Sequence, residues 1–119
     1  MSQNFQPGDL LVFQLEAGFA LLRLLDIEEA AEGTVWHVSA YSDFFPDVES
    51  AEAAGKSPGN LRVGSPHLAL STRAFESTQV ARLTNVPLTA EELEPLRNWR
   101  ADARREVADR SIRLLLGLR

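Results

Sequence analysis

Cysteine is absent from this 119-residue chain, which also holds only one methionine and two histidines. The lack of cysteine excludes disulfide bonds, thiolate nucleophiles and cysteine-ligated zinc or iron–sulfur sites. No apolar run approaches the roughly 20 residues that a membrane-spanning helix needs. Residues 1–6 lack the basic and apolar regions of a signal peptide. We therefore expect a cytoplasmic, soluble protein with no membrane partner.

Basic residues are scarce over most of the chain. Residues 1–88 hold eleven acidic and five basic side chains, and residues 89–119 hold six acidic residues and seven arginines, for a formal net charge of −5. Nucleic-acid binding takes its affinity from neutralising many phosphates, so we expect no nucleic-acid partner. An acidic surface suits a protein partner with a basic surface, although such charge also serves solubility alone.

The first part of the chain is rich in strand patterns. Residues 10–15 and 19–27 are apolar on both alternating faces and are joined by a short turn, which predicts a hairpin covered on both sides. Residues 34–41 alternate as a third strand does. Shorter candidates are the strands 61–63, 67–71 and 78–84 and a helical turn at 72–76 capped by Ser71 or Thr72.

Length and pattern together predict a single domain over residues 1–119, of the α+β class and mostly β. Residues 1–86 would form a small SH3-like five-stranded barrel, or a strongly bent antiparallel sheet, with a helix packed on it. Residues 42–60 form a long loop, in which 48–54 can make two turns of helix and Pro58-Gly59 suits a type II turn.

Residues 87–117 are predicted to form the packed helical segment. Thr89 and Glu92 have the spacing of a capping box at a helix N-terminus. Pro95 predicts a kink in the helix, and Gly117 is expected to end it. The apolar face, which we expect to dock across the first hairpin, contains Leu96, Trp99, Ala103 and Val107. Because the end of the chain is more apolar than one docking face requires, a homodimer through residues 107–118 is an alternative.

Aromatic and acidic residues gather after the third predicted strand. Aromatic side chains can anchor a protein partner while carboxylates steer it, so residues 41–47 are the best candidate surface. The alternative is that the two phenylalanines plug the end of the barrel. The candidate binding residues here are Tyr41, Asp43, Phe44, Phe45 and Asp47.

A second candidate site centres on the two histidines, His37 and His67. With Tyr41 and Arg73 they could line a pocket that binds a small molecule or hydrolyses one. With Asp43 or Asp47 they could also ligate a metal, but their spacing does not require one, so we expect no metal and no cofactor. No nucleophile elbow or triad order is present, so we assign no catalytic residue.

Two short segments resemble small bacterial immunity proteins of polymorphic-toxin systems. The first, Gly8-Asp9-Leu10-Leu11-Val12-Phe13, has a Gly-Asp pair before an apolar strand. The second, Gly18-Phe19-Ala20-Leu21-Leu22-Arg23, has glycine and an aromatic residue before a second strand that contains a basic residue. The tail from Pro87 to Leu93, with Trp99, is similar to endings of uncharacterised small bacterial proteins. The resemblance implies an intracellular, non-catalytic inhibitor that binds a toxin.

These patterns fit three functions. The first is a non-enzymatic binding protein that engages a basic protein partner through residues 41–47. The second is a small-molecule-binding protein or hydrolase with a pocket near His37, Tyr41 and His67. The third is a structural homodimer.

Overall fold

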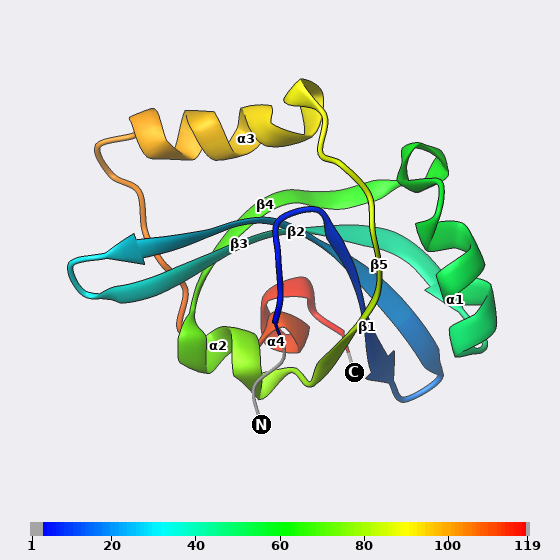
Figure 1. The fold of residues 1–119 in the computed structure, drawn as a ribbon. Coiled ribbons are helices and arrows are strands. Elements are labelled where there is room, and N and C mark those ends of the chain that lie inside the picture. Colours follow the sequence, from blue (N-terminus) through cyan, green and yellow to red (C-terminus); the bar gives the residue numbers. More distant parts are fainter. Residues whose placement is uncertain (1–3, 119) are drawn as a thin grey trace.

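The computed structural model describes residues 4–118 of the chain. Five antiparallel strands form one sheet in the order β4-β3-β2-β1-β5 (Figure 1). The prediction of an α+β, mostly β fold is confirmed. Within residues 4–118 no pairing joins the edge strands β4 and β5, so the sheet is open and an SH3-like barrel is not confirmed. The strands are β1 (Asp9–Leu15), β2 (Gly18–Ala30), β3 (Gly33–Phe45), β4 (Val63–Ser71) and β5 (Val80–Asn85).

The predicted opening hairpin is confirmed as β1 and β2, with Leu15 opposite Gly18 at the turn. The strand β3 is longer than predicted, because it keeps pairing with β2 as far as Phe45, which lies opposite Phe19. The loop predicted over residues 42–60 is therefore wrong for residues 42–45, which continue the strand.

Most of the rest of the predicted 42–60 loop forms helical turns. The helix predicted at 48–54 is confirmed as α1 (Val48–Gly55), which Asp47 caps at its N-terminus. The predicted type II turn is wrong: Gly59 does not have a positive φ, and residues Pro58–Asn60 form the 3-10 turn η1. The two short strands expected over residues 61–71 are one strand, β4.

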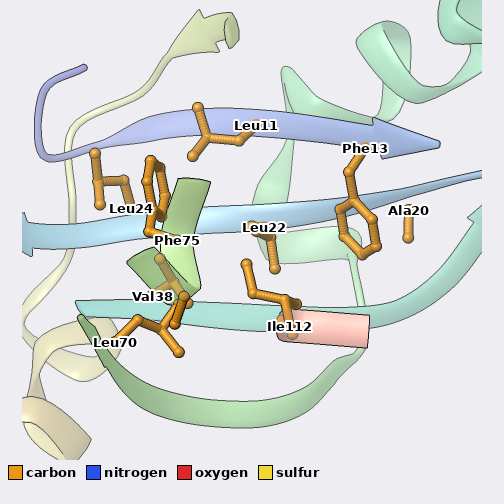
Figure 2. Packing of buried hydrophobic residues seen from close by; sticks show 11 residues of the cluster. Leu11, Phe13, Ala20, Leu22, Leu24, Val38, Leu70, Phe75 and Ile112 are labelled. Atoms are coloured by element: carbon orange, nitrogen blue, oxygen red, sulfur yellow. The ribbon is translucent and has the colours of Figure 1, made fainter. Parts of the chain in front are cut away.

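One face of the sheet carries the main hydrophobic core (Figure 2). Two short helices cover it, α2 (Thr72–Ser77) and α4 (Ile112–Leu116), and they contribute the buried side chains of Phe75 and Ile112. Trp36 stacks on Phe75 with ring centroids 4.2 Å apart. The buried members of this cluster are Leu11, Phe13, Ala20, Leu22, Leu24, Val38, Ala40, Leu70, Ala74, Phe75 and Ile112.

The opposite face is divided between two helices. At one end, Ala51 of α1 packs on a smaller apolar cluster that includes Leu10 and Leu21. Next to it lies α3 (Ala90–Ala101), which contacts β2 and β4 and buries Leu96. Leu21 and Arg23 are two residues apart on β2 and so point to the same face. On that face α1 covers Leu21, and α3 covers Arg23.

The helix α3 begins with the capping box predicted from Thr89 and Glu92, in which each side chain bonds the other residue's backbone N–H. The predicted kink at Pro95 is not observed, because α3 continues without interruption from Ala90 to Ala101. Proline at this position removes one hydrogen bond to the first turn. We attribute its tolerance to the capping box and to Glu92, which anchor that turn independently.

The C-terminal segment differs from the one packed helical segment, kinked near Pro95, that is predicted over residues 87–117. Its two helices lie on opposite faces of the sheet, and residues 102–111 pass around the edge of β4 between them (Figure 1). Ala108 pairs there with β4, donating to Ala69 O at 2.8 Å and accepting from Ser71 N at 2.9 Å. Of the face expected to dock on the hairpin, Leu96 is buried and Trp99 half-buried, but Val107 is 42% exposed. Gly117 ends α4 with a positive φ of 68°, as predicted.

Arg23 fixes the position of α3 on the sheet. Its side chain is fully buried, and its three nitrogens donate to Gly8 O at 2.6 Å, Val86 O at 2.8 Å, Pro87 O at 3.2 Å and both carboxylate oxygens of Glu92. A buried guanidinium is stable only when its donors are satisfied and its charge is balanced. Arg23 thus ties α3 and the segment before it to β2.

Replacing the counter-ion of Arg23 tests this role. Glu92→Gln keeps a side chain that can complete the capping box but leaves the buried guanidinium without its negative partner. We expect the free energy of unfolding to fall by about 3 kcal/mol, measured by chemical denaturation. Glu94→Gln is the matched control, because Glu94 is exposed on the same helix. Equal stability of the two variants would contradict the assigned role of Arg23.

Candidate functional site

The sequence-predicted site residues lie in three separate places. His37 and His67 lie between the sheet and α3, whereas Arg73 is on α2, which covers the opposite face. Arg73 binds Asp109 and is exposed. The predicted grouping of Arg73 with the histidines is therefore wrong, because α2 lies on the face of the sheet opposite to that of His37 and His67.

The two histidines form one hydrogen-bonded unit. His37 Nδ1 lies 2.9 Å from His67 Nε2, and His37 Nε2 lies 3.0 Å from Glu28 Oε1. Trp99 of α3 packs against both imidazole rings, and Arg100 binds Glu28 and Asp26. Sequence reasoning missed these four partners, since pairing across three strands and a helix leaves no local pattern.

The partners of His37 determine its protonation. A carboxylate only accepts, so the neutral His37 ring donates from Nε2 to Glu28 and accepts at Nδ1 from His67. Burial lowers the pKa of His37 despite the opposing hydrogen bond of Glu28. Burial, together with the charges of His37 and Arg100, lowers the pKa of His67 to about 4. Both rings are therefore neutral near pH 7, and the two histidines form a polar contact between the sheet and α3.

The two carboxylates predicted to steer a partner are both used locally. Asp43 accepts from the backbone N–H of Arg62 at 2.7 Å and from its Nε at 3.2 Å. Asp47 accepts from Ser50 N at 2.7 Å as the cap of α1, which holds the pKa of Asp47 below its ordinary value. Both residues therefore help to shape this end of the sheet.

The two phenylalanines at the end of β3 have different roles. Phe45 packs against the small cluster beneath α1, in line with the plugging role considered for it. Phe44, one residue away, is 56% exposed. Neighbouring strand residues point to opposite faces, and Phe44 is on the face where α4 lies.

Phe44 lies where three shallow hollows meet. One, of about 280 Å³, is shared with Leu115, Leu116 and Leu118 at the end of α4 and with Gly64 and Ser65 of β4. The second, of about 270 Å³, extends to the β1–β2 turn with Leu15 and Glu16. The third, of about 410 Å³, reaches Ala53 and Ala54 of α1. We call Phe44 and the residues that line these three hollows the Phe44 surface.

The leucines of the Phe44 surface could be suspected from the sequence alone, because residues 112–116 are more apolar than one docking face requires. Their position beside Phe44 could not, since it follows from residues 102–111 carrying the chain to the opposite face of the sheet. Leu114, in the same helix, is 72% exposed.

No family model matches the chain, and neither a curated protein nor a solved structure is significantly similar to it. Among residues 4–118, no helix is long and apolar enough to cross a membrane.

The histidine unit makes stability depend on pH. The unfolded chain takes up protons on histidine as the pH falls through about 6.5, whereas folded His67 takes one up only near pH 4. The stabilising contribution is therefore fully present above about pH 6.5 and is lost as the pH falls toward 4. We expect the free energy of unfolding to drop by about 2 kcal/mol between about pH 7.5 and about pH 5.

Chemical denaturation at the two pH values measures this drop. His67→Gln retains a hydrogen-bond donor toward His37 but removes the titrating ring, so most of the drop should disappear in this variant. An unchanged pH dependence in His67→Gln would assign the effect to other groups.

Proposed function

We propose that the protein is a non-enzymatic binding module that docks a basic protein partner on the Phe44 surface. The observation that carries the proposal is the exposure of Phe44 at the junction of three hollows, two of which are lined mainly by apolar groups. Aromatic side chains are enriched in the cores of protein interfaces, where they act as anchors. Exposed contiguous apolar surface with a polar rim is characteristic of protein interaction sites.

The charge around this surface favours a basic partner. Glu16 borders one hollow, and Glu49 and Glu52 project from α1, whose alanines line another. All three carboxylates are exposed, and none forms an ion pair within the described range. The exposed Arg62 is paired with Asp43. Unpaired carboxylates around an apolar centre would steer a positively charged protein toward it.

The environment of His37 argues against the hydrolase alternative. His37 is fully buried, and its two ring nitrogens are occupied by Glu28 and His67. A general base needs a ring nitrogen within reach of a substrate, so the histidine unit supports the packing of α3 better than it supports catalysis.

The resemblance of residues 8–13 and 18–23 to immunity proteins suggests a toxin domain as the class of partner. An acidic inhibitor with an apolar anchor would suit a toxin whose active surface is basic. The alternative of a homodimer through residues 107–118 would use the same leucines, with a second copy covering Phe44.

Substitution of the anchor tests the proposal. We expect tagged protein to capture one stoichiometric partner from its native host, and Phe44→Ser to weaken that complex by about 30-fold or more, because a central aromatic anchor is lost. Affinity capture with mass spectrometry identifies the partner, and titration of the purified proteins gives the Kd.

Val107→Ser is the matched control, since Val107 is 42% exposed and lies in the connection between α3 and α4. It should bind as the original protein does. Recovery of the chain with only a second copy of itself, or a Kd unaffected by Phe44→Ser, would refute docking of a basic partner on this surface.

A further inference from the structure

A fourth hollow, of about 210 Å³, lies between the first half of α3 and the strands β3 and β4. The sheet contributes the side chains of Ser39 and Tyr41, and α3 contributes Glu91, Glu92 and Pro95. Val63 of β4 borders the opening and is 56% exposed. The hollow therefore has an apolar rim, two hydroxyls on its floor and two carboxylates on one side.

The side chains of Tyr41 and Ser39 are largely buried, and neither hydroxyl has a partner within residues 4–118. Tyr41 is 5% exposed and Ser39 is 7% exposed, and the side-chain hydrogen bonds within residues 4–118 include none from either hydroxyl. Burial raises the pKa of Tyr41 to about 12, so its hydroxyl is neutral at ordinary pH and can accept as well as donate. The one fully enclosed side-chain oxygen without a partner among residues 4–118 is Thr78 Oγ1, so the hydroxyls of Tyr41 and Ser39 are open to the hollow that they line. Both are free to bond a ligand or water there.

The charge of the hollow is negative. All five donors of Arg23 are directed at Glu92 and at three backbone carbonyls, so Arg23 has none left for an anion. Glu92 is likewise occupied, by Arg23 and by Thr89. Glu91 is exposed and forms no ion pair or hydrogen bond within the part of the chain that the structure describes. The uncompensated charge that borders the hollow is thus the carboxylate of Glu91.

We propose that this hollow binds the side chain of a lysine or arginine of the protein partner. Glu91 would balance the charge, the hydroxyls of Tyr41 and Ser39 would accept hydrogen bonds, and Val63 and Pro95 would contact the aliphatic stem. The Tyr41 ring adds an aromatic surface, which attracts cations. The assignment of the cation to a protein side chain rests on the proposed function. The preference of the hollow for a cation rests only on the residues that line it.

The hollow and the Phe44 surface lie on either side of one strand end. Gly64 and Ser65 of β4 line a hollow of the Phe44 surface, while Val63 of the same strand borders the hollow beneath α3. Tyr41 of β3 lines both. A partner seated across this end of β4 can therefore place an apolar group beside Phe44 and a basic side chain beneath α3.

A titration with small cations tests the site without the partner. The probes are n-butylguanidinium and n-butylammonium, followed by amide chemical shifts in NMR spectra at constant ionic strength. We expect saturable shifts at Ser39, Tyr41 and Glu91 with a Kd of about 1–10 mM, the range of a small fragment. Butyrate and n-butanol, which match the stem but lack the positive charge, should give none.

Variants separate charge and hydroxyl contributions. Glu91→Gln should weaken binding of both cations about fivefold, as expected for a partly exposed ion pair. Tyr41→Phe should weaken it by a smaller factor, through loss of one acceptor. Glu94→Gln is the control, since Glu94 is exposed on the same helix outside the hollow, and should bind as the original protein does.

Failure of this inference is distinguishable from failure of the proposed function. Absence of saturable shifts at these residues, equal shifts with butyrate, or full affinity in Glu91→Gln would overturn the cation site, whatever partner Phe44 holds. Capture that is lost in Phe44→Ser but unchanged in Glu91→Gln would also overturn it, while leaving docking on the Phe44 surface intact.

Discussion

The buried charge of Arg23 is the constraint on which the arrangement of the protein depends. A guanidinium in the middle of a sheet must have every donor satisfied, and here the acceptors come from segments far apart in sequence, around Gly8, Val86 and Glu92. Gly8 has a φ of 96°, and a Cβ there would lie 2.8 Å from Val86 O, so only glycine allows these segments to meet over Arg23. The position of α3 follows from this network.

Placing α3 over Arg23 makes that face of the sheet unlike the other. The main core lies on the opposite face and is fully apolar, whereas α3 covers a polar strip that includes His37, Ser39 and Tyr41. A hollow of about 210 Å³ remains beneath α3 beside this strip. On the apolar face, α4 is only five residues long and leaves Phe44 exposed at the far end of β3. Both candidate binding features therefore arise where helices cover the sheet incompletely.

The sequence predicts those parts of the fold whose signals are local. The doubly apolar hairpin, the capping box at Thr89 and the C-terminal Gly117 follow from patterns a few residues long, and each is found in the structure. The separation of the C-terminal segment into two helices on opposite faces could not be predicted, because it depends on Ala108 pairing with the edge of β4. The absence of a kink at Pro95 also depends on contacts between distant segments, because the tertiary contacts of Glu92 hold the first turn of α3.

The candidate site was predictable only in part. Phe44 stands out in the sequence as an aromatic residue between acids, but its leucine neighbours come from the other end of the chain. His37 and His67 attract attention as the two histidines, yet their proximity follows from the pairing of β3 with β4, where His37 lies opposite Ala69. Tyr41 was a candidate from the sequence, but its position beneath α3 was not predicted, and Ser39 gives no sequence signal, because only the packing of α3 brings the two hydroxyls to one hollow.

Both proposals place one partner across the open end of β4, in contact with both sides of it. Photo-crosslinking in the native host tests this directly, with a photoreactive phenylalanine analogue incorporated singly at position 44, 63 or 107. Positions 44 and 63 should yield an adduct with the same protein, and position 107 should yield none. Adducts with different proteins at 44 and 63, or equal crosslinking at 107, would contradict the claim.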